Sequence, residues 1–261
     1  AQVKSSILLA GLYADGVTAI SEPGKSRDHT ERMLKAMGVD LDIKNLEVRI
    51  KGGAMLKPLD ITVPGDLSSA AFFIVAGILV PRSEIVIRNT GINPTRTGII
   101  DILKMMGADI RFENEKKISE EPVADIYVKH SELKGMNIDG KMVLRAIDEF
   151  PVMCVAAAKA HGTTKITGAR ELRVKESDRI ASIASELKKM GARIEEFEDG
   201  LIIVGSEDLK PAIIQSYHDH RIAMSMLVAG LTVKGETTVK DIECIDTSFP
   251  DFIKILGELT K

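Results

Sequence analysis

Hydrophobic residues recur at helical spacing in three stretches of the chain, and these stretches end in nearly the same way. The shared ending is Leu, Lys, a variable residue, Met, Gly and then Val or Ala, at residues 34–39, 103–108 and 187–192. Apolar side chains three or four positions apart lead into each ending, which predicts three amphipathic helices. Glycine tolerates the left-handed conformation that often follows a helix, so Gly38, Gly107 and Gly191 are expected to cap them. Strand-like segments follow the caps at residues 40–43, 109–113 and 193–197.

A second pattern, an almost wholly apolar helix followed by a turn and a β-branched strand, alternates with the first. The predicted apolar helices occupy residues 7–14, 69–80, 152–160 and 222–231. The strands that follow them occupy residues 17–20, 84–87, 163–166 and 236–239. Helices that are apolar on every side are buried, so these four are expected to lie inside the fold.

The two patterns combine into one repeated unit: buried helix, strand, amphipathic helix, strand, strand. The third copy ends in a predicted hairpin, because Asp199 and Gly200 form a turn signal between two strand-like segments. The spacings from Leu34 to Leu103 and from Leu103 to Leu187 are 69 and 84 residues, longer than the roughly 20 to 50 residues of solenoid repeats. An α/β fold is therefore expected, with units packed around a common centre, helices inside and sheets outside. The Pro-Gly break within residues 63–66 is the best candidate boundary.

Composition excludes several classes of protein. The chain has 35 Lys and Arg against 38 Asp and Glu, a net charge of −3, so no overall field favours nucleic acid or an anionic membrane. There is no apolar run of the roughly 18 residues that a membrane span needs, and no signal-peptide pattern, so a cytoplasmic protein is expected. Cys154 and Cys244 are interpreted as buried thiols rather than a disulfide or a metal site. The chain opens without Met, which suggests a fragment.

Basic residues gather at the starts of three predicted helices, although the helix dipole favours cations at the opposite end. The clusters are Lys25, Arg27 and His29; Arg173, Lys175 and Arg179; and His218, His220 and Arg221. Such a repeated violation favours binding of anions such as phosphate or carboxylate by these side chains and free helix N–H groups. The alternative is that the cations are solvated or pair with nearby carboxylates, namely Asp28, Glu31, Glu176, Asp178 and Asp219.

Carboxylates occur close to these cations. Asp148 and Glu149 precede Pro151 and would ordinarily be read as the N-cap of a buried helix, while Glu176 follows Lys175 directly. A cleft that holds anions beside carboxylates has what proton transfer requires, because neighbouring charges tune the pKa of each carboxyl group. The nucleotide-binding and zinc motifs are absent from the sequence, so no metal site is predicted.

Six segments resemble the C-terminal part of the enolpyruvylshikimate-phosphate synthase family, and they occur in the family's order along the whole chain. They are residues 1–5, 26–34, 147–151, 171–179, 219–224 and 247–250. The resemblance implies an inside-out α/β barrel, with two domains that each contain three β-α-β-α-β-β units. Residues 1–65 would be the last unit of the first domain and residues 66–261 most of the second, with the rest of the first domain absent.

The family likeness also implies a reaction. The enolpyruvyl group of phosphoenolpyruvate would pass to the 5-hydroxyl of shikimate-3-phosphate through a tetrahedral intermediate, with loss of phosphate. The implied shikimate-3-phosphate contacts are Gln2, Ser26, Asp148 and Lys175. The implied phosphoenolpyruvate contacts are Gln2, Arg179, His220 and Arg221. The implied catalytic residues are Asp148, as the base for the attacking hydroxyl, and Glu176, in proton transfer to the methylene carbon.

The same likeness implies no metal or organic cofactor, no nucleic-acid or membrane partner, and a monomeric full-length enzyme. This chain by itself is expected to be inactive, because one wall of the family's cleft is missing. Two other functions stay open. One is the related enolpyruvyl transfer to UDP-N-acetylglucosamine, and the other is a non-catalytic anion-binding fragment.

Overall fold

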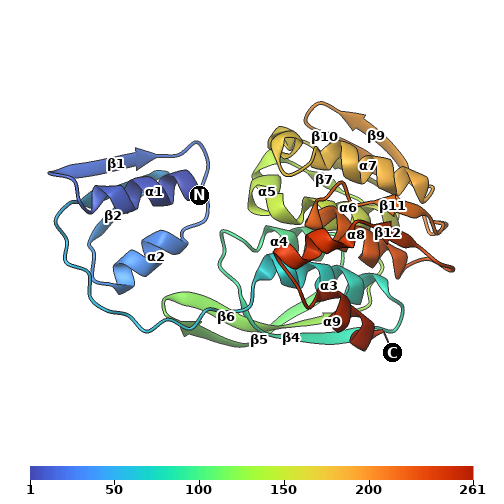
Figure 1. Cartoon of the computed structure of the whole chain (residues 1–261), viewed down its shortest axis with the longest axis horizontal. Coiled ribbons are helices and arrows are strands. Elements are labelled where there is room, and N and C mark those ends of the chain that lie inside the picture. The colour runs from blue at the N-terminus through green and yellow to red at the C-terminus, as the bar shows by residue number, and fades with distance from the viewer. Residues whose placement is uncertain (261) are drawn as a thin grey trace.

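The computed structural model describes residues 1–260, which form two lobes joined by an extended segment (Figure 1). The first lobe is one copy of the predicted unit. Its elements are α1 (Gln2–Gly11), β1 (Val17–Ser21), α2 (His29–Ala36), β2 (Leu41–Lys44) and β3 (Glu47–Lys51). The three strands form an antiparallel sheet in the order β1-β3-β2, and their core side chains pack with Leu8 and Leu34 from the helices.

The second lobe contains two further copies of the unit and a third that, within the described residues, ends after its amphipathic helix. The first copy is α3 (Leu67–Leu79), β4 (Glu84–Gly91), α4 (Gly98–Met105), β5 (Asp109–Ile118) and β6 (Glu121–Lys129). The next is β7 (Asn137–Ile138), α5 (Gly140–Arg145), α6 (Phe150–Lys159), β8 (Thr163–Ile166), α7 (Arg179–Lys189), β9 (Arg193–Phe197) and β10 (Gly200–Val204). The last is β11 (Ile213–Gln215), α8 (His220–Gly230), β12 (Thr238–Lys240) and α9 (Phe252–Leu259).

Each unit of the second lobe carries its own sheet, in the orders β4-β6-β5, β7-β8-β10-β9 and β11-β12. The predicted hairpin is confirmed, because β9 and β10 pair antiparallel. Its turn lies at Glu198 and Asp199, and Gly200 already belongs to β10, where it pairs with Phe197. Strand β7 pairs parallel with β8, to which α5 and α6 connect it, and β11 pairs parallel with β12 through α8.

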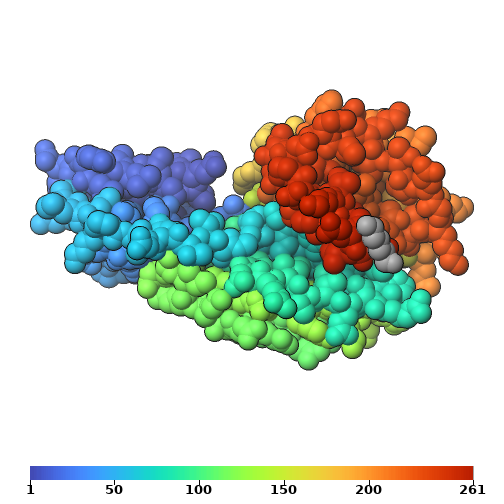
Figure 2. All heavy atoms as spheres, turned by 60° about the horizontal axis from the view of Figure 1, so that its bottom comes forward, coloured from blue at the N-terminus to red at the C-terminus, as the bar shows by residue number. Residues whose placement is uncertain are grey.

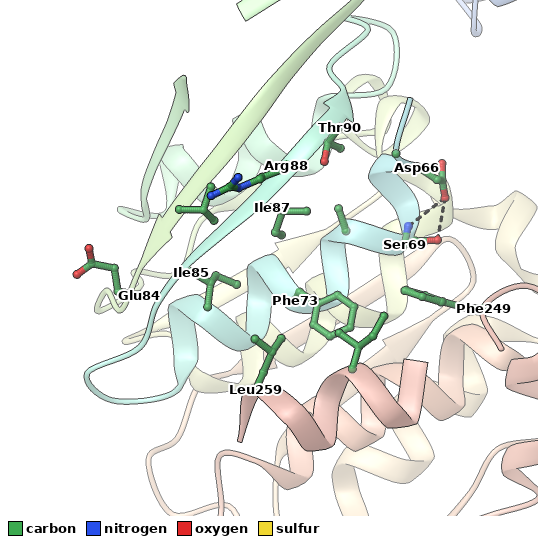
Figure 3. Close-up of a pocket in the computed structure, with 14 residues that line it drawn as sticks. Asp66, Ser69, Phe73, Glu84, Ile85, Ile87, Arg88, Thr90, Phe249 and Leu259 are labelled. Carbon is green, nitrogen blue, oxygen red and sulfur yellow. Dashed lines mark hydrogen bonds between the residues drawn. The ribbon is translucent and has the colours of Figure 1, made fainter. Parts of the chain in front are cut away.

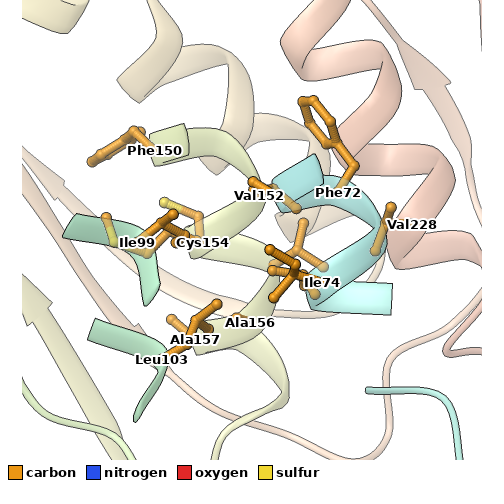
Figure 4. Close-up of a cluster of buried hydrophobic side chains, with 14 of the residues drawn as sticks. Phe72, Ile74, Ile99, Leu103, Phe150, Val152, Cys154, Ala156, Ala157 and Val228 are labelled. Carbon is orange, nitrogen blue, oxygen red and sulfur yellow. The ribbon is translucent and has the colours of Figure 1, made fainter. Parts of the chain in front are cut away.

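The three apolar helices of the second lobe, α3, α6 and α8, pack against one another at its centre. Figure 4 shows this core, where Ile74 of α3 lies near Ala156 and Ala157 of α6 and Val228 of α8. Every side chain of α6 except that of Lys159 is buried, so the prediction of helices inside and sheets outside is confirmed. Cys154 is one of these buried side chains, and Cys244 is half-buried; both thiols are free.

The prediction of a fully buried helix is wrong for the first copy. Helix α1 begins at Gln2, five residues earlier than expected, and only Lys4, Leu8 and Gly11 are buried. Its other face exposes Val3 and Leu9. Within the described residues the first lobe has one unit, so no second central helix packs against α1, whereas α3, α6 and α8 cover one another.

The predicted C-terminal caps are confirmed in all three amphipathic helices. Gly38, Gly107 and Gly191 have φ angles of 88°, 107° and 90°. The residue after each glycine donates its N–H to the carbonyl five positions earlier, as Val39 does to Leu34 at 2.9 Å. This is the Schellman arrangement, which satisfies helix carbonyls that would otherwise lack partners.

The two lobes have separate hydrophobic cores, one within residues 8–50 and the other within residues 67–256. They touch through polar groups. Asn93 Nδ2 donates to Asp28 Oδ1 at 2.7 Å, and His29 Nδ1 lies 2.7 Å from Glu121 Oε1. In Figure 2 the green hairpin of β5 and β6 lies beside the first lobe, close to the cyan connecting segment. No helix of the described residues is long and apolar enough to cross a bilayer.

Candidate functional site

A cleft of about 510 Å³ lies between the lobes. It brings together every site residue that the sequence predicted except His220. The predicted residues that line it are Gln2, Ser26, Asp148, Lys175, Glu176, Arg179 and Arg221. Gln2 comes from the start of α1, Ser26 from the loop before α2, and the others from segments at the starts of α6, α7 and α8. The fold therefore places the N-terminal ends of helices from both lobes around one polar space.

Asp148 is the carboxylate on which the cations of the cleft converge. The guanidinium group of Arg27 hydrogen-bonds to its Oδ2 across the cleft. Arg221 NH2 lies 3.7 Å from the same oxygen, and Arg179 NH1 lies 3.8 Å from Oδ1. Burial alone would raise the pKa of Asp148, but the charges of Arg221, Arg27 and Arg179 outweigh burial and hold the pKa below its usual value.

Neither Asp148 nor Glu149 caps the following helix with its side chain, so the ordinary N-cap interpretation holds only for the position of Glu149. Asp148 lies in the 3-10 turn Ile147–Glu149, and the N-cap position of α6 belongs to Glu149, whose side chain makes no capping bond. Instead the buried Glu149 carboxyl accepts a hydrogen bond from Ser68. Burial raises the pKa of Glu149, and the charge of Asp148 adds to this effect. Two consecutive carboxyl groups are thus shifted in opposite directions.

Arg179 is fixed by carboxylates before any ligand is considered. Its side chain is 1% exposed, and its Nε donates to Asp219 Oδ2 at 2.9 Å. Its NH2 group donates to Glu176 at 2.6 Å. Asp219 is itself fully buried, and although burial opposes it, hydrogen bonding and the charge of Arg179 lower the pKa of this carboxyl. NH1 is the part of the guanidinium that faces Asp148.

Asp219 also orients Arg221, because its carboxylate accepts the backbone N–H of Arg221 at 2.9 Å as the N-cap of α8. The Arg221 side chain then reaches back to the carbonyl oxygen of Asp148 at 3.0 Å. His220 is half-buried beside them and does not line the cleft. Burial, aided by the charge of Arg221, lowers the pKa of His220, which favours a neutral imidazole. Its role with phosphoenolpyruvate stays a prediction.

Not every member of the basic clusters points into the cleft. Arg173 is bonded to Asp178 and Glu196, each at 2.9 Å, so the pairing alternative holds for this residue. His29 pairs with Glu121 across the lobes, a partner that lies far away in sequence. His218 is exposed and lies in a left-handed backbone conformation. Lys175 lines the cleft, where its ammonium group lies 2.6 Å from Glu171.

Sequence reasoning did not name Arg27 as a site residue, although it is the first-lobe cation closest to Asp148. The available signal was its membership in the first basic cluster. Its partner is 121 residues away in sequence, so only the relative placement of the two lobes reveals the contact. Glu171 and Thr95 also line the cleft. Glu171 opens the family-like segment 171–179 but was given no role, and Thr95 carried no sequence signal.

A larger cavity of about 650 Å³ lies elsewhere, between α3, β4 and α9, and is a poor candidate for the site. Figure 3 shows the apolar side chains Phe73, Ile85, Ile87, Phe249 and Leu259 around it, and Arg88 and Thr90 of β4 also belong to its lining. None of the predicted site residues lines this cavity. Among residues 1–260, no group of three or more His, Cys, Asp or Glu side chains is placed to hold a metal ion.

Comparison with known proteins assigns the chain to a family. The family described as EPSP synthase (3-phosphoshikimate 1-carboxyvinyltransferase) matches residues 1–256. The chain belongs to the EPSP synthase family. It is 57% identical over 256 residues to the 3-phosphoshikimate 1-carboxyvinyltransferase of Citrifermentans bemidjiense, with 98% of this chain and 60% of that protein aligned. For the corresponding protein of Geotalea uraniireducens the identity is 59% over 259 residues, covering 99% and 60% of the two chains.

Solved structures of related proteins agree with the fold. EPSP synthase from Acinetobacter baumannii superimposes with a TM-score of 0.93 at 49% identity, covering 99% of this chain and 60% of that one. The enolpyruvyl transferase NikO from Streptomyces tendae gives a TM-score of 0.79 at 22% identity, over 97% of this chain and 57% of NikO, which supports the fold alone. The predicted inside-out α/β barrel is confirmed. This chain spans about 60% of the length of its curated relatives.

Proposed function

We propose that the chain is part of an enzyme that transfers the enolpyruvyl group of phosphoenolpyruvate to the 5-hydroxyl of shikimate-3-phosphate and releases phosphate. The observation that carries the proposal is the convergence of Arg27, Arg179 and Arg221 on Asp148 in the cleft between the lobes. Both substrates are polyanions, and guanidinium groups bind carboxylate and phosphate bidentately without losing their charge. Membership of the EPSP synthase family supports the same reaction.

The second-lobe cations suit phosphoenolpyruvate. Arg221 lies at the N-terminal end of α8, where the helix dipole also favours an anion, and Arg179 lies beside it at the start of α7. His220 would add a hydrogen bond rather than a charge if its imidazole is neutral. Gln2, Ser26 and Lys175 line the cleft around Asp148 and would contact shikimate-3-phosphate, with Gln2 touching both substrates.

Asp148 would act as the base. Its lowered pKa keeps it ionised at neutral pH, so it is ready to accept the proton of the 5-hydroxyl. As the hydroxyl oxygen bonds to C2 of phosphoenolpyruvate, the double-bond electrons take a proton at the methylene carbon, which Glu176 would donate. The tetrahedral intermediate then loses phosphate by cleavage of the C2–O bond, and the proton held by Asp148 passes to the leaving phosphate. The new methyl group returns a proton to Glu176, which restores the enol ether. Anionic substrates that draw Arg27 and Arg221 away would make Asp148 more basic.

In this proposal residues 1–65 are the last unit of the first domain of the complete enzyme, and residues 66–261 are most of the second. The separation of the two hydrophobic cores supports this division. The proposed setting is the cytoplasm, where both substrates would be available, and the complete enzyme is proposed to be a monomer without a cofactor.

The test uses the full-length protein that carries this sequence. Phosphate release should require both phosphoenolpyruvate and shikimate-3-phosphate, and UDP-N-acetylglucosamine should not replace the latter. Turnover with UDP-N-acetylglucosamine would favour the related transferase instead. Binding without turnover, equally strong for inorganic phosphate and shikimate-3-phosphate, would favour a simple anion-binding protein. The 261-residue chain alone should give negligible turnover, because it spans only about 60% of the length of its curated relatives.

A further inference from the structure

Ser26, the proposed phosphate contact of the first lobe, already has both of its hydrogen-bond donors engaged. Its hydroxyl group donates to Glu22 Oε2 at 2.6 Å, and its backbone N–H donates to Glu22 Oε1 at 3.3 Å. Glu22 directly follows β1, so the two residues close a short turn at the edge of the cleft. A carboxylate that accepts from both groups occupies the position that a bound anion would take.

Glu22 has a second partner that does not depend on Ser26. The ammonium group of Lys4 donates to Glu22 Oε1 at 3.0 Å and also lies 2.7 Å from Glu31 Oε1. The Lys4 side chain is only 5% exposed, so this contact is shielded from solvent. Although burial opposes it, hydrogen bonding by Ser26 and Lys4 holds the pKa of Glu22 below its usual value. The carboxylate is therefore ionised at neutral pH and would keep a cation if Ser26 turned away.

The polarity of the hydroxyl group makes the two arrangements exclusive. Serine has one O–H donor, and while it donates to Glu22 its oxygen can only accept. A phosphate dianion offers only acceptors, so Ser26 must break its bond to Glu22 before it can donate to the substrate. The negative charge of Glu22 also opposes binding directly, because it repels the negatively charged phosphate.

We propose that Glu22 is an internal anion that competes with the phosphate of shikimate-3-phosphate for Ser26, and so sets the affinity of the cleft for the phosphorylated substrate. The proposal rests on the proposed function, because it assumes that Ser26 contacts that phosphate. Binding then exchanges one anion for another at Ser26, while Lys4 retains Glu22. An uncharged group in place of the phosphate is a weaker acceptor than the carboxylate and does not displace it.

The experiment measures the Kd of shikimate-3-phosphate by calorimetry on the full-length protein and its variants. Glu22→Gln removes the charge but keeps the size, so the Kd should fall about three- to tenfold, since a hydrogen bond to a charged group is replaced by a neutral one. Glu31→Gln is the matched control, because it removes the same charge from the same lysine without touching Ser26. Its Kd should stay within about twofold of the wild type.

A double-mutant cycle identifies the route of the effect. Ser26→Ala removes the hydroxyl for which Glu22 and the phosphate compete. In that background Glu22→Gln should give little of the gain in affinity that it gives in the wild type. If Glu22→Gln lowers the melting temperature sharply, Glu22→Asp takes its place, because it draws the carboxylate back from Ser26 while keeping the charge near Lys4.

The results that overturn the proposal have a different sign or pattern. Weaker or unchanged binding by a folded Glu22 variant would make Glu22 a support for the turn and not a competitor. An equal gain in Glu31→Gln would reduce the effect to overall charge. Failure of the wild-type protein to bind shikimate-3-phosphate would instead reject the proposed function itself, so the two failures are distinguishable.

Discussion

The two walls of the cleft hold their cationic and donor groups in different ways. In the second lobe, Arg179 is 1% exposed and bonded to the fully buried Asp219, which also accepts the backbone N–H of Arg221. In the first lobe, the Arg27 side chain is 35% exposed and reaches across the cleft to Asp148, and Ser26 is bonded to Glu22. One wall is fixed by buried partners, whereas the other is held by contacts that a ligand can replace.

The difference follows from burial. A guanidinium that has lost its water depends on its carboxylate partners, and removing one leaves an uncompensated buried charge. Contacts at a solvent-exposed edge are worth much less, because water and ions replace them readily. We therefore expect the second-lobe wall to be preorganised for an anion, and the first-lobe wall to rearrange when a substrate binds.

The largest expected effect belongs to Asp148, where the two walls meet. Asp148→Asn in the full-length enzyme should lower kcat by about 10²- to 10⁴-fold, because the base is lost while size and hydrogen bonding are kept. The Kd of shikimate-3-phosphate should change much less, since the carboxylate acts mainly in the transition state. Steady-state kinetics and a melting temperature from one preparation decide the matter. An unchanged kcat with normal folding would remove Asp148 from the catalytic residues.

The next effect tests whether the second-lobe wall is fixed by burial. Asp219→Ala removes an N-cap and leaves Arg179 without its main partner, so the free energy of unfolding should fall by about 3 kcal/mol or more. Asp178→Ala is the control, because Asp178 caps α7 in the same way but pairs with the partly exposed Arg173. The free energy of unfolding of Asp178→Ala should fall by about 1 kcal/mol. Urea unfolding measures both, and equal losses would contradict the role assigned to burial.

A smaller effect separates the two substrates. Arg221→Ala in the full-length enzyme should weaken the binding of phosphoenolpyruvate about ten- to a hundredfold. This is the effect expected from losing a charge-assisted bidentate contact worth about 1.5 to 3 kcal/mol. The affinity for shikimate-3-phosphate should fall only a few-fold. Arg173→Ala is the control and should leave both affinities nearly unchanged, because Arg173 is the member of its basic cluster that does not line the cleft. Equal weakening of both substrates by Arg221→Ala would reject its assignment.

The smallest effect is a difference in how fold stability depends on pH at two neighbouring carboxyl groups, Asp148 and Glu149. The folded pKa of Asp148 lies below the roughly 3.9 of an unfolded chain, so its carboxylate stabilises the fold above about pH 4, and this is lost as the pH falls through the folded pKa. Glu149 has a raised pKa, so its contribution is lost as the pH rises above about 4.

Urea unfolding of the 261-residue chain across pH checks both signs. Asp148→Asn should flatten the acid side of the stability profile, and Glu149→Gln should flatten the decline that appears as the pH rises toward neutrality. The same slope change in both variants would mean that the two carboxyl groups share one environment, contrary to the structure.

Much of the fold was accessible from the sequence because its signals are local. The spacing of apolar residues located α3, α6 and α8. The glycines at 38, 107 and 191 ended the amphipathic helices α2, α4 and α7 as expected. Burial of α1 could not be predicted in the same way, since an apolar face is buried only if another element packs on it. The residues 7–14 have the same apolar pattern in either case.

The candidate site divides along the same line. The sequence by itself determined which residue types gather at helix starts, and so it pointed to Arg179 and Arg221 as anion-binding positions. For Asp148 the local pattern favoured a helix cap, and only the family resemblance implied a catalytic role. Only the tertiary structure decided which cations face the cleft, that Arg173 is turned away, and that Arg27 meets a carboxylate 121 positions along the chain. The reason is physical: helix caps and apolar spacing depend on neighbours within a few residues, whereas ion pairing, burial and the resulting pKa values depend on distances that exist only after the lobes have packed.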